Sequence, residues 1–517
     1  GDDSYITDDI VEMSVEDEEN YRIADLADFV VDSNGKILNH NRVLCRGPEN
    51  ESISKQTVNY VDIEYVDFVN VTPTQFISWA TATVPLMGAN DAVRVNFGIA
   101  QTKAAKGLVS PDVPRLMTSA NKIIPRLNTN YCIFAEKDGT VIEADGQHLI
   151  ILYDGDYDVK RYYYDTVESA LYSCTVRTTL VKTDERFKKG QMLMTSNFVK
   201  DGFLAMGVNA LVCYQPNGFN YEDGNYASTR LCNRLTSYRV NHGYWENSSK
   251  FDSIRFTGIS KLKWASDDDP LFTIQGHKGT KSTHDRSIYP EKIKGFLNSV
   301  EQRRSTNRYG RSYLEGLDYT TVSIDSVTSG DKLTNRHGNK GVVPQKIVRV
   351  FEKNEDTVFK QVNNSEMPRL SNGVFMDLVY NPLGVGSRMN TGQCKEANIG
   401  LSCHVLDIHV LTDSFNCISN DEIAMLMSYT YDLANEDDFE AVVARYPQIP
   451  MGLHEHCREN IDKIRLWKGV FDKEGYAYLI LPKNGCKETE TRVLIGVETI
   501  YKLVQESDKK IHVRGGL

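Results

Sequence analysis

One stretch of the sequence, at residues 330–342, reads Gly330-Asp331-Lys332-Leu333-Thr334-Asn335-Arg336-His337-Gly338-Asn339-Lys340-Gly341-Val342. Glycines punctuate it, it follows the strand-like run at 321–324, and it carries two lysines, an arginine and a histidine. Glycine lets a backbone approach a ligand closely, and lysine supplies a compact positive charge suited to phosphate. The pattern therefore favours a phosphate or polyphosphate site over a solvated surface loop.

Three further motifs accompany this stretch. They read Asn90-Asp91-Ala92-Val93-Arg94, then Pro216-Asn217-Gly218-Phe219-Asn220-Tyr221-Glu222-Asp223, and after the lysine stretch Val379-Tyr380-Asn381-Pro382-Leu383-Gly384-Val385-Gly386-Ser387-Arg388-Met389-Asn390-Thr391-Gly392-Gln393. In this order the four motifs resemble the active-centre segments of the second-largest subunit of multisubunit RNA polymerases. The Gly-Asn-Lys-Gly at 338–341 is similar to bacterial and plastid β subunits, because archaeal and eukaryotic counterparts usually carry Gln at the position of Asn339.

The resemblance extends to both ends of the chain. Residues 7–46 resemble a segment from the middle of β, and residues 497–514 resemble the β stretch whose histidine, His512 here, lies near the initiating nucleotide. The chain therefore resembles the carboxy-terminal half of a bacterial-type β subunit. A β subunit split into two polypeptides is typical of the polymerases of giant bacteriophages.

The resemblance implies roles for individual residues. As catalytic residues, Lys332 and Lys340 would supply positive charge at the RNA 3′ end and the α-phosphate. The residues that would bind nucleotide or phosphate are Arg94, Arg336, His337, Arg388 and His512. Because the motifs at 330–341 and 379–393 must reach one triphosphate, we expect them to converge in space.

Glu222 and Asp223 would help to hold a second Mg²⁺, directly or through water. The main magnesium aspartates are expected on the β′ partner, because this sequence has no comparable aspartate triplet. The alternatives are a salt bridge in a β-turn for the two acids and a frayed terminus for His512.

The resemblance also implies an α+β, β-rich fold built on a double-psi β-barrel with inserted and flanking lobes. We expect five regions: a mid-β segment at 1–70, the first part of the barrel with the hybrid-binding region at 71–240, a shortened flap-like insertion at 241–325, the lysine loop with the rest of the barrel at 326–410, and a helical and β segment at 411–517.

The implied function is that of a subunit of a DNA-directed RNA polymerase that is active only within its complex. The expected partners are an amino-terminal β half on a separate chain, β′ or its fragments, a promoter-specificity factor, template DNA, RNA and nucleoside triphosphates, with Mg²⁺ held mainly by β′. A non-catalytic structural or regulatory protein that retains a polymerase-like barrel is the alternative.

Composition agrees with an intracellular protein. The 517 residues carry a net charge of −11, which argues against a free-standing nucleic-acid binder but not against a subunit with one basic channel. The ten cysteines include no CxxC pair, residues 1–5 lack the basic and apolar character of a signal peptide, and the sequence contains no apolar run of membrane-spanning length. We expect the cytoplasm of a bacterial host, or a phage virion.

Local patterns give further expectations. The spacing of apolar residues predicts a helix over 72–87, and Ser419 with Glu422 predicts a capping box. Strands are expected at 149–152, 210–214, 347–351 and 492–503. The region up to 325 reads as less regular, and the arginine run at 303–311 suits either a nucleic-acid surface or a solvated loop. The acids at 267–269 and the His-Glu-His-Cys at 454–457 read as a solvated charge run and a helix rather than as metal sites.

Overall fold

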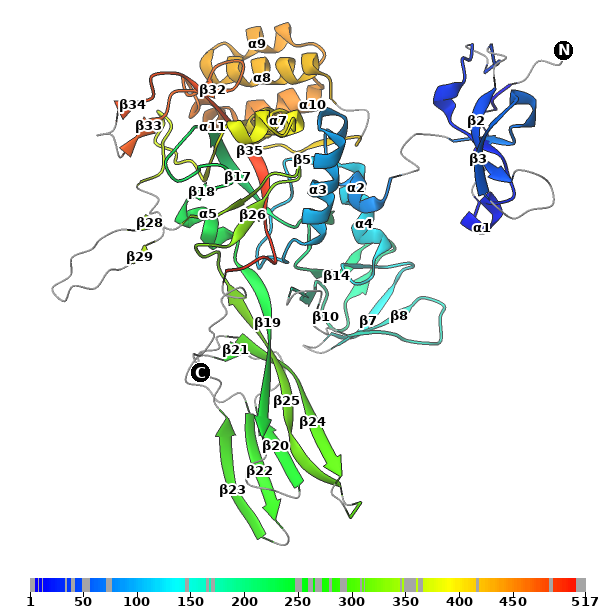
Figure 1. The fold of residues 1–517 in the computed structure, drawn as a ribbon, viewed down its shortest axis with the longest axis vertical. Coiled ribbons are helices and arrows are strands. Elements are labelled where there is room, and N and C mark those ends of the chain that lie inside the picture. Colours follow the sequence, from blue (N-terminus) through cyan, green and yellow to red (C-terminus); the bar gives the residue numbers. More distant parts are fainter. Residues whose placement is uncertain are drawn as a thin grey trace, which may run out of the picture. The chain divides into compact units, whose positions relative to one another are not determined.

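The structure is a computed structural model that describes residues 5–7, 9–11, 13–32, 35–38, 42–48, 56–70, 77–144, 148–163, 167–168, 173–246, 253–258, 264–265, 272–278, 281–288, 295–306, 309–310, 312–344, 346–347, 359–360, 366–414, 418–482 and 487–507. His512, the acidic run at 267–269, and residues 308 and 311 of the arginine run lie outside these ranges. The chain divides into two compact units, Gly1–Ala82 and Thr83–Leu517 (Figure 1). The fold is α+β and rich in strands, as the sequence predicted.

The first unit contains a small sheet with the strand order β3-β2-β1-β4. Its strands are β1 (Ile23–Ala24), β2 (Val43–Pro48), β3 (Gln56–Val61) and β4 (Phe68–Val69), and β1 and β4 run parallel. Helix α1 (Val15–Glu18) begins at Ser14, whose side chain caps it. Alternate residues of β2 face a core that contains Val43 and Cys45.

The second unit is organised around a mixed sheet with the order β18-β30-β17-β35-β26-β27, and β32 joins it through β35. The strands are β17 (Val208–Tyr214), β18 (Tyr226–Ala227), β26 (Lys332–Thr334), β27 (Lys340–Val342), β30 (Leu378–Tyr380), β32 (Tyr476–Ala477) and β35 (Val493–Lys502). Strand β17 runs antiparallel to β35 and parallel to β30. Both β17 and β35 are buried along almost their full length, which explains their nearly continuous apolar sequences and confirms two predicted strands.

Helix α7 (Thr391–Leu406) lies directly against β35 (Figure 1). The approach is close because glycines meet neighbours on both sides. A Cβ at Gly400 would lie 2.0 Å from the carbonyl oxygen of Val497, and a Cβ at Gly496 would lie 2.5 Å from that of Ala397. This packing brings polar residues of α7 against β35, which is an interior strand of the central sheet.

The remaining C-terminal helices share one hydrophobic core with α7. They are α8 (Asn420–Asn435), α9 (Phe439–Arg445), α10 (Met451–Glu459) and α11 (Ile461–Arg465). The capping box of Ser419 and Glu422 is confirmed at the start of α8. His454 and His456 of α10 bind different groups, the Tyr429 hydroxyl and the carbonyl of Leu406, so the His-Glu-His-Cys motif has ordinary structural contacts.

The helix predicted over 72–87 is confirmed only in part, as a shorter helix. Helix α2 contains only Trp79–Ala82, and a turn at Met87–Ala89 follows it. Pro85 disfavours helical backbone at the residue before it, and Leu86 has a left-handed φ of 55°. The next long helix is α3 (Ala92–Lys103), and shorter ones are α4 (Ser119–Leu127), α5 (Thr229–Arg234) and α6 (Leu383–Gly386).

Several smaller sheets complete the region after α4. One has the order β13-β7-β8-β9 and another β12-β14-β6. Their strands are β6 (Ile133–Phe134), β7 (Gly139–Ala144), β8 (His148–Tyr153), β9 (Lys160–Tyr163), β12 (Arg177–Thr179), β13 (Arg186–Phe187) and β14 (Met192–Ser196). Strand β5 (Leu116–Thr118) pairs with β31 (Val410–Thr412), and short pairs form from β10 (Val167–Glu168) with β11 (Cys174–Thr175) and β15 (Val199–Lys200) with β16 (Phe203–Leu204). Strand β8 confirms the prediction at 149–152.

The region predicted to be less regular contains long strands instead. These are β19 (Ser237–Glu246), β24 (Gly295–Thr306) and β25 (Ser312–Asp325), with β21 (Trp264–Ala265) at the edge (Figure 1). A second sheet pairs β20 (Ser253–Gly258), β22 (Phe272–Lys278) and β23 (Lys281–Ile288). Arg303 and Arg304 lie on β24 rather than in a loop, and the Arg303 guanidinium lies 3.3 Å from Asp318 and over the ring of Tyr244.

The other short strands are β28 (Lys346–Ile347), β29 (Phe359–Lys360), β33 (Ile480–Leu481) and β34 (Lys487–Glu488). Strand β28 falls in the predicted strand at 347–351, most of which lies outside the described residues. Among the helices that the structure describes, none has the length and apolar character needed to cross a membrane.

Candidate functional site

The two lysines of the central motif lie on one face of a short hairpin. Strands β26 and β27 pair in the register Lys332 with Val342 and Thr334 with Lys340. Paired residues, and residues two apart on a strand, point to the same face of a sheet, so both lysine side chains leave the hairpin on the same side. Both are partly buried. Strand β26 also pairs with β35, which fixes the hairpin to the central sheet.

The loop between the lysine strands is ordered by one side chain. The Asn335 carboxamide oxygen accepts hydrogen bonds from the backbone N–H groups of His337 and Asn339, at 3.0 and 3.1 Å. The backbone N–H of Asn335 donates to the carbonyl of Asn339 at 3.2 Å. A buried side chain therefore supplies the acceptors that a tight turn would otherwise leave missing.

Helix α3 packs against this loop through two glycines. A Cβ at Gly98 would lie 2.4 Å from the carbonyl oxygen of Arg336, and a Cβ at Gly338 would lie 2.5 Å from that of Arg94. Gly338 also has a φ of +75°, which favours glycine. The sequence suggested that the glycines of 330–342 let the backbone approach a ligand, but Gly338 instead lets the loop approach helix α3.

Because α3 packs against the loop, Arg94 on this helix lies next to the loop. Arg94, Gly98 and Gln101 are spaced to share one face of the helix. The Arg94 guanidinium donates to the carbonyl of Gly338 at 3.4 Å, and the Thr334 hydroxyl donates to the side-chain oxygen of Gln101. Helix α3 begins at Asp91, whose carboxylate accepts from the N–H of Val93 at 3.1 Å.

Arg388 meets the same loop from the segment after α6. Its guanidinium donates to the side-chain oxygen of Asn339 at 3.2 Å and forms an ion pair with Asp223. The segments at 330–341 and 379–393 therefore converge, as predicted. Burial and, next, the nearby charge of Arg388 lower the pKa of Arg94, so the two arginines belong to one cluster of positive charge.

The acidic pair occupies a turn that is attached to the lysine hairpin. The N–H of Val342 donates to the carbonyl of Asp223, and the N–H of Asn225 donates to the carbonyl of Val342, both at 2.8 Å. Glu222 is exposed and has a left-handed φ of 50°. Asp223 is about half exposed, with 51% of its side-chain surface accessible.

The acids offer an incomplete set of metal ligands. Mg²⁺ takes six oxygen ligands in an octahedron, whereas Glu222 and Asp223 supply two adjacent carboxylates, one of which is paired with Arg388. Among the described residues there is no group of three or more His, Cys, Asp or Glu side chains that could hold a metal ion. These two acids thus fit an auxiliary role at a metal whose other ligands come from elsewhere.

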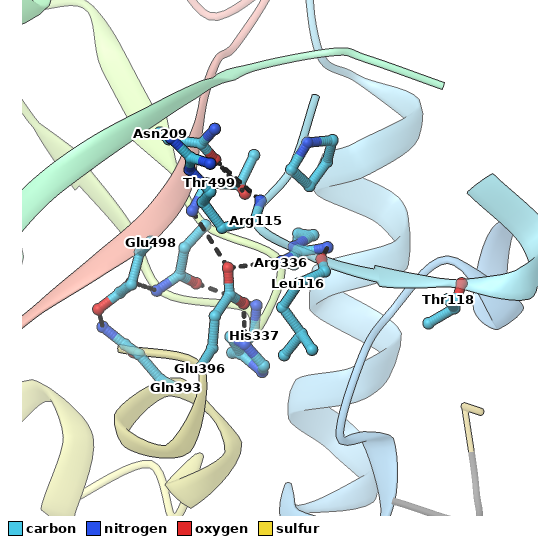
Figure 2. Close-up of polar contacts among 12 residues, drawn as sticks. Arg115, Leu116, Thr118, Asn209, Arg336, His337, Gln393, Glu396, Glu498 and Thr499 are labelled. Carbon is cyan, nitrogen blue, oxygen red and sulfur yellow. Dashed lines mark hydrogen bonds and ion pairs between the residues drawn. The ribbon is translucent and has the colours of Figure 1, made fainter. Parts of the chain in front are cut away.

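Arg336 and His337 bind a carboxylate within the chain. Both are fully buried, and both bind Glu396 of α7 (Figure 2). The Arg336 guanidinium and the His337 Nε2–H donate to different oxygens of this carboxylate, each at 2.6 Å. The N–H of Thr499 on β35 also donates to Glu396, at 3.1 Å. The sequence predicted phosphate binding for Arg336 and His337, whereas their contacts in this structure support the loop.

Charge pairing keeps Glu396 ionised in the interior. Burial alone would raise the pKa of this carboxyl, but the positive charge of Arg336 and the hydrogen bond from His337 outweigh burial and lower the pKa to about 2. The tautomer of His337 follows from its second contact. The Asn90 amide accepts from the N–H of Gly392 and donates to His337 Nδ1 at 2.9 Å, so the ring proton is on Nε2.

A second buried acid, Glu498 on β35, lies beside this cluster (Figure 2). Burial, followed by the negative charge of Glu396, raises the pKa of Glu498 to about 8. Its carboxyl oxygens contact the Tyr214 hydroxyl, the Asn335 amide at 3.0 Å and the Gln393 amide at 3.4 Å. The surroundings thus shift the pKa values of the two acids in opposite directions, and both side chains hold the loop to α7 and β35.

The supporting residues Glu396, Glu498, Gln393 and Asn335 were not assigned roles from the sequence. A signal for one of them was present, because Glu498 interrupts the otherwise mainly apolar run of β35. The predicted nucleotide contact of His512 lies outside the described residues.

Comparison with known proteins identifies the family of the chain. The profile of RNA polymerase Rpb2, domain 6, matches residues 256–516, and the chain belongs to this family. It is similar to the DNA-directed RNA polymerase β subunits of Thermus thermophilus (28% identity over 476 residues, 83% of this chain and 40% of the relative) and Spiroplasma citri (26% over 459 residues, 80% and 33%). The β subunit of Malacoplasma penetrans is 25% identical over 505 residues, 89% of this chain and 33% of the relative. The chain thus spans about a third to two fifths of the length of these relatives.

Proposed function

We propose that this chain forms the β side of the active centre of a multisubunit DNA-directed RNA polymerase. The observation that carries the proposal is the convergence of Arg94, Arg388 and the hairpin of Lys332 and Lys340 on one loop, although they come from three distant segments. A cluster of cations with partly exposed heads suits a triphosphate, whereas a purely structural barrel has no need of it.

Nucleotidyl transfer spreads negative charge over the reacting phosphoryl group, so catalysis consists largely of positioning and electrostatic stabilisation. Lys332 and Lys340 supply positive charge at the RNA 3′ end and the α-phosphate. Arg94 and Arg388 bind the β- and γ-phosphates, for which the planar guanidinium is well suited. Mg²⁺, held mainly by the β′ partner, supplies further charge neutralisation when bound.

The remaining site residues have auxiliary roles in this proposal. Glu222 and Asp223 assist at the second Mg²⁺, directly or through water, and Asp223 also orients Arg388. Arg336 and His337 hold the lysine loop through Glu396. His512 lies near the priming nucleotide.

The proposal extends to the assembly. The mixed sheet of β17, β26, β27, β30 and β35 is part of a double-psi β-barrel, and the region of β19–β25 is a shortened flap. The partners are an amino-terminal β half on a separate chain, β′, a specificity factor, DNA, RNA and nucleoside triphosphates. The complex transcribes phage genes in the bacterial cytoplasm or is packaged in the virion.

Purification tests this proposal against the alternative of a non-catalytic protein. The chain should co-purify with an amino-terminal β half and with β′ pieces that carry the aspartate triplet, and the complex should extend RNA on a DNA template. The chain alone should be inactive. The control is a complex of the same partners prepared without this chain. If that complex extends RNA as well as the complete one, the non-catalytic alternative is favoured.

A further inference from the structure

The guanidinium of Arg388 is held by two groups, the carboxylate of Asp223 and the side-chain amide of Asn339. A guanidinium only donates hydrogen bonds, so its contact with Asn339 at 3.2 Å requires the carboxamide oxygen, not the nitrogen, to face Arg388. Asn339 is only 5% exposed. Solvent therefore does little to orient this amide, and its protein neighbours decide which end faces the arginine.

Gln393 makes the contact that orients Asn339. The Asn339 amide nitrogen donates to the side-chain oxygen of Gln393 at 3.2 Å. The same oxygen accepts from the amide nitrogen of Asn390 at 2.9 Å, and the Gln393 nitrogen donates to Glu498 at 3.4 Å. Gln393 is fully buried, so all its hydrogen-bonding capacity is directed at protein groups.

The polarity of this chain of amides is fixed at both ends. Asn390 also donates to the backbone carbonyl of His337 at 3.3 Å, and because a carbonyl only accepts, the amide nitrogen of Asn390 must point this way. Gln393 must then present its oxygen to Asn390 and to Asn339. Asn339 in turn must present its oxygen outward, where Arg388, which only donates, meets it.

We infer that Gln393 is a positioning residue for nucleotide binding, which acts through Asn339 to hold Arg388 ready for the triphosphate. The inference rests on the proposed function, because it takes Arg388 as a phosphate ligand. Gln393 itself touches no substrate. It lies one turn before Glu396 on α7, so one helix supports Arg388 through Gln393 and the lysine loop through Glu396.

Loss of the Gln393 oxygen removes the acceptor that holds the Asn339 nitrogen. The amide can then rotate and present its nitrogen to Arg388, where donor faces donor, or leave the nitrogen buried without a partner. The result is an arginine that is less well preorganised for a phosphate. We expect the KM for nucleotide to rise about tenfold while kcat changes by less than about twofold, because the lysines are untouched.

The test uses the assembled polymerase and measures KM and kcat for addition of one nucleotide to an RNA primer. Gln393→Leu should raise KM, whereas Gln393→Glu, which keeps an acceptor oxygen, should restore KM to within about threefold of the unmodified complex. If the leucine variant does not assemble, Gln393→Met removes the acceptor with less change of shape. Gln191→Leu is the matched control, because Gln191 accepts from Lys188 in a turn before β14 and has no contact with this cluster.

Asn339→Leu should raise KM as much as Gln393→Leu, and the double variant should be no worse than either, since both act on one path. Additive effects, an unchanged KM in Gln393→Leu, or a loss confined to kcat would overturn the inference. Arg388→Ala distinguishes failure of the proposed function from failure of the role given to Gln393. If it leaves KM unchanged the proposed function fails, and if it raises KM while Gln393→Leu does not, only the role of Gln393 fails.

Discussion

Single side chains below the surface decide how the lysine loop is held. Glu396 compensates a buried guanidinium and binds a buried imidazole. The sequence predicted a charged loop correctly but assigned Arg336 and His337 to a ligand, because charge beside glycine resembles a phosphate site. Their true partner lies about sixty residues further along the chain, and no local pattern reveals such a contact.

We predict that Glu396→Gln strongly destabilises the second unit. The substitution keeps the shape of the side chain but leaves Arg336 as a buried cation without a counter-charge, which typically costs about 3–5 kcal/mol. Thermal unfolding measures the effect. Glu436→Gln is the matched control, because Glu436 pairs with Arg445 at the surface, where such a pair contributes about 0–1 kcal/mol. Equal losses in the two variants would contradict the role given to Glu396.

The two buried acids should also give the unfolding temperature opposite dependences on pH. The folded-state pKa of Glu396 is lowered to about 2. Its contribution to the free energy of unfolding is therefore complete above the ordinary pKa of 4.5 and is lost as the pH falls towards 2. The pKa of Glu498 is raised to about 8, so the folded chain keeps a proton that the unfolded chain releases above 4.5. Its contribution therefore declines as pH rises towards 8.

Glu498→Gln isolates the second effect, since an amide does not titrate and fits the same contacts to Asn335 and Tyr214. We predict that the unfolding temperature of this variant, relative to the unmodified chain, increases steadily from pH 5 to pH 8. A difference that stays constant over this range would show that Glu498 does not hold a proton in the folded chain.

At the scale of elements, the site depends on two close contacts, α3 against the lysine loop and α7 against β35. Strands β17 and β35 were predictable because their apolar residues form continuous runs. The helix expected at 72–87 was predicted too long, because the prediction followed the spacing of apolar residues and gave too little weight to Pro85. The close approach of α3 was also hidden, since Gly98 and Gly338 are far apart in sequence.

We predict that Gly338→Ala displaces α3 from the loop. The new Cβ would lie 2.5 Å from the carbonyl oxygen of Arg94, and the φ of +75° adds backbone strain. Because Arg94 moves with α3, the KM for nucleotide in the assembled complex should rise at least several-fold. Gly452→Ala is a suitable control, because Gly452 lies on α10, outside the motifs of the site, and a Cβ there meets nothing within 4 Å. Similar kinetics for the two variants would argue against this packing role.

At the scale of the whole molecule, the chain supplies cations but, in its described part, no cluster of metal ligands. The order of four motifs along the sequence sufficed to predict the family and the meeting of Arg388 with the lysine loop. It could not predict the pairing of β19 with β25, whose paired residues, such as Ser237 and Asp325, are far apart in the sequence. The proposed division of the active centre between chains explains why this chain is expected to be inactive alone.

The central claim, that Lys332 and Lys340 act in nucleotidyl transfer, is tested most directly by the rate of single-nucleotide addition in the assembled complex at saturating nucleotide. Lys332→Ala and Lys340→Ala each remove a charge worth about 3–4 kcal/mol at the transition state, so each should slow addition by about 10²–10³-fold while co-purification with the partners is unchanged. Lys188→Ala, an exposed lysine elsewhere in the unit, should extend RNA at the normal rate. Normal rates in both active-centre variants would contradict the account.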